Sequence, residues 1–284
     1  MSNSKIVIVG SYGQLGKALA SHFEGAFCVD RDRLDITDQA AVESFDWSGV
    51  EILINAAAYT NVDGAETTDG RRAAWQINSS AVSNLARVAI KHDLTMIHIS
   101  SDYVYDGTVS PHSEEEPLTP LGVYAQTKAA GDLVVSTVSK HYILRISWLI
   151  GDGLNFVRTM IGLAGRDISP SVVNDQVGRL TFTPELVGAI DYLLVKDAAY
   201  GLYNFSGAGE AASWADITKT IFKEVGRDDL KVTGVSTEAY YRGKDGIAPR
   251  PLQSTLDLSK IEATGFTIQD WRKSLEDYIK KELS

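Results

Sequence analysis

Tyr124 and Lys128 stand four residues apart, the spacing of neighbours on one face of a helix. An ammonium group close to a phenol favours the ionised phenol, which lowers a pKa that starts near about 10. A tyrosine in that setting is a usable proton donor at neutral pH. Upstream, Ser101 closes a predicted strand, where its hydroxyl would bond a substrate oxygen. We therefore interpret Ser101, Tyr124 and Lys128 as candidate catalytic residues.

A glycine-rich turn lies near the start of the chain, between a predicted strand and a predicted helix. Its glycines Gly10, Gly13 and Gly16 form a GxxGxxG pattern, which differs from the GxGxxG of many dehydrogenases. The spacing permits a tight turn, close approach of a pyrophosphate to the backbone, and phosphate contacts with helix amides. Glycines also serve turns for conformational reasons alone, but the strand, the helix and the strands that follow favour dinucleotide binding. The candidate cofactor-binding residues here are Gly10, Tyr12, Gly13, Gln14, Leu15 and Gly16.

The end of the second predicted strand bears on which dinucleotide binds. Asp30 would accept hydrogen bonds from ribose hydroxyls and favours NADH, whereas Arg31 would hold a 2′-phosphate and favours NADPH. We predict that Asp30 and Arg31 both contact the cofactor, and that this cofactor is NADPH, with NADH as the alternative. Asn78 lies in a predicted helix before the fourth strand, where its amide would hold backbone or a water near Lys128.

The elements that position these residues follow a βαβ rhythm. Short apolar runs predict parallel strands, and because they are continuously apolar, the sheet should be covered on both faces. The predicted strands are 5–9, 26–30, 51–55, 95–100, 142–146, 171–174 and 201–205. The predicted helices are 13–23, 39–45, 72–92, 124–139, 156–164, 184–195, 214–225 and 268–283, with a loop over 238–250.

This pattern predicts an α/β fold with a Rossmann-like, doubly wound parallel sheet. Residues 1–150 are expected to form the dinucleotide-binding domain. Residues 151–284 are expected to form a smaller, mainly substrate-binding α/β region, interleaved with the first because no flexible linker separates them.

Composition excludes several classes of protein. The 27 basic and 37 acidic side chains give a net charge of −10, which argues against nucleic acid as a partner. Cys28 is the single cysteine, so no intrachain disulfide forms. No apolar stretch approaches the roughly 20 residues that span a bilayer, and the start lacks signal-peptide features. We expect a cytoplasmic protein without a membrane partner.

Longer motifs make the sequence resemble the extended short-chain dehydrogenases, and among them the dTDP-4-dehydrorhamnose reductase family. The likeness runs nearly end to end. Besides the glycine turn, Tyr124 and Lys128, its carriers are 35–38 (DITD), 55–63 (NAAAYTNVD), 101–107 (SDYVYDG), 145–148 (RISW), 155–157 (NFV), 173–178 (VNDQVG) and 250–254 (RPLQS).

The resemblance implies NADPH-dependent reduction, with NADH possible, of the C4 keto group of dTDP-4-dehydro-L-rhamnose to dTDP-L-rhamnose. It implies Ser101, Tyr124 and Lys128 as the catalytic trio, with Lys128 also holding the cofactor. Further cofactor contacts implied are Asp35, Ile36, Ala56, Ala57, Ala58 and Tyr59. Implied substrate contacts are Val62, Asp102, Tyr103, Trp148, Asn155 and Arg250, the last on the nucleotide diphosphate.

Alternatives remain at this stage. The chain could reduce or epimerise another nucleotide-linked 4-keto sugar, or be a non-catalytic NADP-binding regulatory subunit. A dehydratase is disfavoured because Tyr103 follows Asp102 where dehydratases carry glutamate. Some relatives dimerise around a metal through a glutamate where this chain has Ala18, so we expect no metal and a monomer or weak homodimer. Other departures from the family pattern are Ala125, Asp132 and Leu180.

Overall fold

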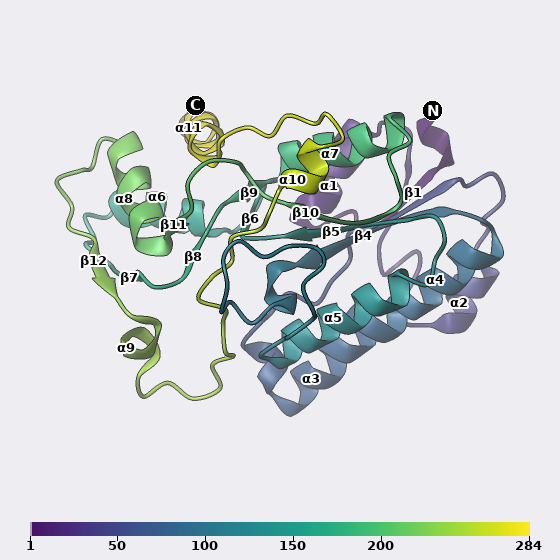
Figure 1. Ribbon diagram of the computed structural model, residues 1–284, viewed down its shortest axis with the longest axis horizontal. Helices are drawn as coiled ribbons and strands as arrows, with labels where there is room; N and C mark the ends of the chain where they lie inside the picture. The colour runs from purple at the N-terminus through teal and green to yellow at the C-terminus, as the bar shows by residue number, and fades with distance from the viewer. Residues whose placement is uncertain (1) are drawn as a thin grey trace.

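The structure, a computed structural model, describes residues 2–284 and is built around a six-stranded parallel sheet (Figure 1). The strand order is β10-β5-β4-β3-β1-β2. The strands are β1 (Ile6–Val9), β2 (Phe27–Val29), β3 (Ile52–Asn55), β4 (Thr95–Ser101), β5 (His141–Ile146) and β10 (Gly201–Phe205). The chain leaves β1 in one direction for β2 and returns on the other side for β3. This reversal creates the crevice in which open α/β sheets bind ligands.

Helices cover both faces of the sheet, which explains the continuously apolar strands. One face carries α1 (Gln14–His22), α7 (Thr183–Val195) and α10 (Ser259–Glu262). The other carries α2 (Gln39–Ser44), α3 (Thr68–Trp75), α4 (Ala81–Lys91) and α5 (Val123–Val135). Alternate residues of β1 face opposite sides: Ile6 and Ile8 belong to one apolar core and Val7 and Val9 to the other. The predicted doubly wound α/β fold is confirmed.

A third group of elements lies beyond one end of the sheet, at the left of Figure 1. Its helices are α6 (Phe156–Ala164), α8 (Trp214–Glu224), α9 (Thr237–Tyr241) and α11 (Trp271–Leu283). Its strands are β6 (Leu149–Ile150), β7 (Ser171–Val173), β8 (Val177–Gly178), β9 (Thr181–Phe182), β11 (Ala212–Ser213) and β12 (Thr233–Val235). They pair two by two, as β11 with β8, β12 with β7 and β6 with β9. A separate apolar core, which includes Val157, Phe222 and Trp271, holds this group together.

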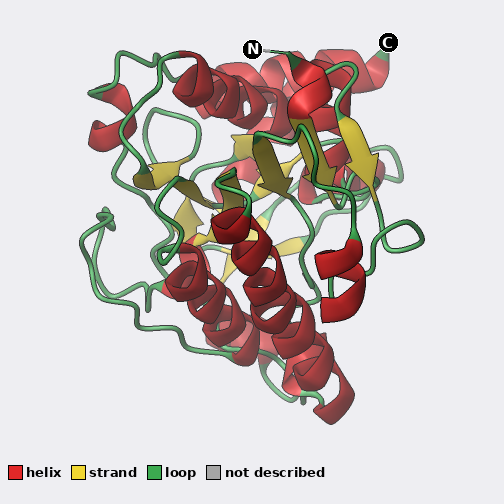
Figure 2. Ribbon diagram, turned by 90° about the vertical axis from the view of Figure 1, so that its right-hand side faces the viewer, coloured by secondary structure: helices red, strands yellow, loops and turns green. Residues whose placement is uncertain are grey.

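Short helical turns complete the chain. They are 3-10 turns at Asn3–Lys5, Gly64–Glu66 and Asp102–Val104, and a π-helical turn at Gln76–Ser80. Figure 2 shows both termini on the same side of the molecule. None of the helices in residues 2–284 is both long and apolar enough to cross a membrane.

Two predictions of local structure were wrong. The helix expected over 72–92 starts earlier, at Thr68, and is interrupted by the π-helical turn. That turn contains Asn78, whose buried amide bonds groups outside the helix. The loop expected over 238–250 begins inside α9, because the Ser236 hydroxyl caps that helix by accepting from the Ala239 amide.

Candidate active site

The glycine-rich turn follows β1 and is shaped by contacts that leave no room for side chains. Gly10 has φ +78°, and a Cβ there would lie 2.6 Å from the Ala57 nitrogen. A Cβ on Gly16 would lie 2.0 Å from the Gly10 carbonyl oxygen. The first turn of α1 follows, and its N-cap residue Gly13 has no side chain to bond the helix amides. Those amides are a site for an anionic group such as a pyrophosphate.

A cavity of about 360 Å³ lies beside this turn, at the crevice between β1 and β3. Nine of the residues predicted to bind the cofactor line it: Gly10, Gly13, Asp30, Arg31, Asp35, Ile36, Ala56, Ala57 and Ala58. Ala73, Gln76 and Ile77 also line it. Val9, Leu34 and Thr37 complete the lining, and none of these six residues was predicted.

The polar side chains in this cavity differ in how strongly they are hydrogen-bonded to other protein groups. The Asp30 carboxylate accepts from the Ser11 hydroxyl at 2.7 Å. The Asp35 carboxylate accepts from the Thr37 hydroxyl at 2.6 Å, and that hydrogen bond lowers the pKa of Asp35. The Arg31 side chain is 82% exposed and touches Asp35 only at 3.3 Å. Arg31 is therefore the group that can turn toward a phosphate.

A second cavity, of about 390 Å³, continues from the first and shares Gly13, Ala56 and Ala58 with it. It holds all three candidate catalytic side chains, which come from the end of β4 and the first turns of α5. The other predicted site residues that line it are Gln14, Leu15, Val62, Asp102, Tyr103 and Trp148. Thr60, Ile99, Ser100, Ile146 and Leu149 complete the lining and were not predicted.

Of the three candidate catalytic residues, Ser101 and Lys128 are buried and Tyr124 is half-buried. The Ser101 hydroxyl donates to the Asp102 carboxylate at 3.2 Å and accepts from the Tyr103 amide at 3.2 Å. The rings of Tyr103 and Tyr124 meet edge to face, with centroids 5.8 Å apart. The Lys128 ammonium donates to the Ile99 carbonyl at 2.6 Å, which leaves two of its three N–H donors for a ligand.

Burial sets the proton affinities here. The pKa of Tyr124 is raised to about 12: burial is the largest cause, the hydrogen bond with Ser101 opposes it, and the charges of Asp102 and Asp132 add to it. Burial lowers the pKa of Lys128 to about 8, against the attraction of Asp132. It also raises the pKa of Asp102 to about 6. The pKa of Tyr124 is raised and not lowered as expected, because desolvation of the phenol is the dominant cause and Lys128 is not among the causes of the shift.

Several predicted site residues lie outside both cavities. Tyr12 is 76% exposed, and Gly16 packs beneath the turn. Asn78 accepts from the Tyr59 amide at 2.8 Å and donates to the Thr127 hydroxyl at 3.0 Å, so it braces the wall of the cleft. Tyr59 is held there by its backbone.

Asn155 and Arg250, predicted on the substrate side, are also bonded within the protein. Asn155 caps α6 by accepting from the Arg158 amide at 3.0 Å and donates to the Tyr278 hydroxyl at 2.8 Å. Arg250 donates to both carboxylate oxygens of Asp63, at 2.8 and 2.9 Å. Neither lines the catalytic cavity.

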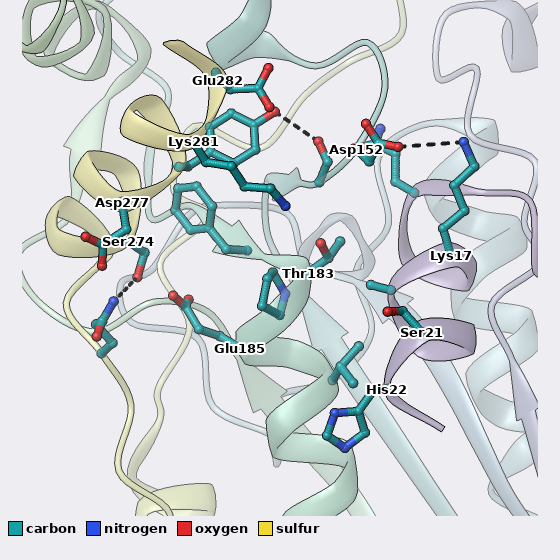
Figure 3. A pocket seen from close by; sticks show the side chains of 18 of the residues that line it. Lys17, Ser21, His22, Asp152, Thr183, Glu185, Ser274, Asp277, Lys281 and Glu282 are labelled. Atoms are coloured by element: carbon teal, nitrogen blue, oxygen red, sulfur yellow. Dashed lines mark hydrogen bonds and ion pairs between the residues drawn. The ribbon is translucent and has the colours of Figure 1, made fainter. Parts of the chain in front are cut away.

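A further cavity, of about 810 Å³, lies elsewhere, between α1, α7 and α11 (Figure 3). Gln14 is the only predicted site residue in its lining. Glu185 points into it, and burial raises the pKa of that carboxyl to about 7. Within residues 2–284 no cluster of His, Cys, Asp or Glu side chains has the arrangement of metal ligands.

The sequence and the structure are similar to those of known proteins. The family model described as "RmlD substrate binding domain" matches residues 4–284. A relative named dTDP-4-dehydrorhamnose reductase, from Aggregatibacter actinomycetemcomitans, is 36% identical, and the match covers 96% of this chain and 98% of the relative.

Two solved structures bear similar names. A dTDP-4-dehydrorhamnose reductase from Clostridium acetobutylicum has a TM-score of 0.91 and 34% identity, with coverage of 98% of this chain and 99% of its own. One from Bacillus anthracis, in complex with NADP, has a TM-score of 0.88 and 32% identity, with coverage of 97% and 98%.

Proposed function

Because the chain belongs to the dTDP-4-dehydrorhamnose reductase family, we propose that it reduces the C4 keto group of dTDP-4-dehydro-L-rhamnose to the alcohol of dTDP-L-rhamnose. The observation that carries the proposal is the pair of joined cavities. The cavity beside the glycine-rich turn has the N-terminus of α1 and the exposed Arg31, which suit a dinucleotide. The adjoining cavity is lined by Ser101, Tyr124 and Lys128.

NADPH is the cofactor that the residues fit. The backbone of Gly10 and Gly13 would face its pyrophosphate, and the positive charge of Arg31 would face its 2′-phosphate. NADH has a neutral hydroxyl at that position, which gains less from the charge. When bound, NADPH supplies the hydride that the carbonyl carbon receives.

The remaining chemistry belongs to the chain. Tyr124 donates its proton to the carbonyl oxygen as the carbon–oxygen double bond becomes a single bond, so a ketone, a hydride and a proton give one alcohol. A phenol with a pKa of about 12 is fully protonated at pH 7, which suits a donor. Ser101 donates to the same oxygen, and the positive charge of Lys128 offsets the phenolate that remains.

Roles for the sugar follow from the lining. Val62, Tyr103 and Trp148 offer apolar and aromatic surface, while Asp102 can accept from a sugar hydroxyl. We assign Asn155 and Arg250 a supporting role, since their polar groups bind neighbouring protein atoms.

The test is the loss of NADPH absorbance, with NADH in parallel, when purified protein meets dTDP-4-dehydro-L-rhamnose. Tyr124→Phe should cut turnover by at least about 100-fold, the low end of what a general acid contributes, with NADPH affinity kept. Tyr200→Phe, at an exposed tyrosine that directly precedes β10 and lines neither cavity, is the control and should keep wild-type turnover.

Two outcomes would contradict the proposal. A Tyr124→Phe protein with wild-type turnover would remove the tyrosine from the mechanism. Epimerisation of the sugar without net NADPH consumption would replace the reductase with an epimerase.

A further inference from the structure

Two indole rings are stacked at the edge of the catalytic cavity. The rings of Trp148 and Trp214 have centroids 3.8 Å apart and planes 21° apart. Phe156 packs on Trp214, at 4.3 Å between centroids. Trp148 lines the cavity and Trp214 does not. Any effect of Trp214 on the cavity is therefore exerted through Trp148.

The backbone of Trp148 has an uncommon conformation for a bulky residue, with φ +46°. Such a conformation persists only where the surroundings impose it. Here Thr181 bonds both sides of the turn: its amide donates to the Trp148 carbonyl at 3.2 Å and its hydroxyl to the Ser147 carbonyl at 2.5 Å. The Ser147 hydroxyl donates to the Arg179 carbonyl at 2.8 Å. The protein thus holds one orientation of the Trp148 side chain as it leaves β5.

The strand pair β8 and β11 completes this support. Gly178 of β8 lies beside the Trp148 ring, and a Cβ there would be 3.1 Å from the ring atom Cζ2. Gly178 pairs with Ala212 of β11, and β11 runs directly into Trp214 at the start of α8. One small sheet therefore supplies both the gap for the edge of the Trp148 ring and the aromatic surface against its face. Figure 1 shows β8, β11 and α8 together beyond the end of the main sheet.

We propose that Trp214 and Gly178 are positioning residues for the sugar: they fix the Trp148 ring as a rigid wall for the hexose of the nucleotide-sugar substrate. The inference rests on the proposed function and adds to it the residues that set sugar affinity. A ring already held in place loses little conformational freedom on binding, so the affinity gained from packing a sugar on it is kept. Trp214 touches no reacting atom, and its effect falls on sugar binding instead of on hydride or proton transfer.

The experiment compares Trp214→Leu, Trp214→Phe and the wild type by steady-state kinetics with dTDP-4-dehydro-L-rhamnose and NADPH. An aromatic pair contributes up to about tenfold in affinity. Trp214→Leu should therefore raise KM for the sugar about tenfold, with kcat and the KM for NADPH changed less than twofold. Trp214→Phe keeps an aromatic face and should recover most of the sugar affinity.

Trp47→Leu is the matched control. It removes an indole from another aromatic pair, with Phe45, and neither of these two residues lines either cavity. It should lower thermal stability and leave KM for the sugar unchanged. If Trp214→Leu does not fold, Gly178→Ala carries the test, because the added methyl group displaces the Trp148 ring and should also raise KM for the sugar selectively.

Three results would overturn the inference. One is an unchanged KM for the sugar in Trp214→Leu or, where that variant does not fold, in Gly178→Ala. Another is an equal rise in both KM values, which marks general disruption. The third is a wild-type chain that neither reduces the keto sugar nor binds dTDP-L-rhamnose by calorimetry, which would refute the proposed function as well. An active wild type with an unaffected variant refutes this inference alone.

Discussion

Asp132 and Arg145 form an ion pair whose side chains are only 3% and 6% exposed, and Asp132 also acts on Lys128, the lysine proposed to be catalytic. The Arg145 Nε donates to the Asp132 carboxylate at 2.9 Å, and its Nη1 donates to the Tyr105 hydroxyl at 2.6 Å. Asp132 lies one helical turn after Lys128 and favours the charged form of that lysine. One carboxylate therefore serves two buried cations.

Replacement of Asp132 by asparagine keeps the shape and removes the charge. Removing one partner of a buried pair costs about 3–5 kcal/mol, because Arg145 remains buried without a counter-ion. At roughly 2 °C per kcal/mol for a chain of this size, the melting temperature should fall by about 6–10 °C. The pKa of Lys128, already lowered to about 8 by burial, should fall further.

The assay combines thermal unfolding at pH 7 with turnover as a function of pH. Lys128 loses its charge as pH rises through its pKa, so the wild type should lose turnover as pH rises through about 8. In Asp132→Asn this loss should begin at lower pH. Asp132→Glu keeps the charge and is the control for the pH profile. A variant with the wild-type melting temperature and the wild-type alkaline limb would refute the reasoning.

Four further predictions test other parts of the structure. Gly16→Ala puts a carbon 2.0 Å from a backbone oxygen and should abolish NADPH binding measured by fluorescence. Gly188→Ala meets no heavy atom within 4 Å and should stabilise α7 by about 0.5–1 kcal/mol in melting experiments. The pKa of Asp102 is about 6 in the folded chain and 3.8 as the reference, so its charged form is penalised by folding and wild-type stability falls as pH rises from about 4 to 6. Asp102→Asn should then be more stable than the wild type by up to about 3 kcal/mol at pH 7.5 and equal to it near pH 4, and a difference independent of pH would contradict this. Asp63→Asn weakens the bonds that anchor Arg250 and should speed tryptic cleavage of the segment before it about tenfold, whereas an unchanged cleavage rate would show that the pair does not hold that segment.

The elements set by local sequence could be predicted. The strands of the main sheet contain short apolar stretches that local sequence reveals, and β10 (Gly201–Phe205) was placed with its exact bounds. The glycine turn could be predicted because its conformation excludes side chains at fixed spacing. Tyr124 and Lys128 lie on one helix, so their proximity follows from the helical repeat alone.

Features that depend on distant partners could not be predicted. The two-residue strands β6, β8, β9 and β11 are too short to show a periodicity. Each is a strand because it pairs with another segment far along the chain, β6 with β9 and β8 with β11. The π-helical turn at Gln76–Ser80 also depends on distant partners. The hydrogen bonds of Asn78 with Tyr59 and Thr127 stabilise the wider turn, which holds one residue more than an α-helical turn. The pKa of Tyr124 depends on burial, which no spacing of residues reveals.

The role predicted for Arg250 depends on an ion pair that this side chain forms within the protein. Its guanidinium was expected on the nucleotide diphosphate, since the planar fork matches two anionic oxygens. The structure presents the same chemistry within the protein, because the carboxylate of Asp63 offers two oxygens at 2.8 and 2.9 Å. The Asp63 carboxylate also accepts from the Ala248 amide at 3.0 Å, so it fastens the segment before Arg250 to the loop after β3. A diphosphate would have to displace Asp63 from this pair, and the same arginine would then couple substrate binding to the position of that segment.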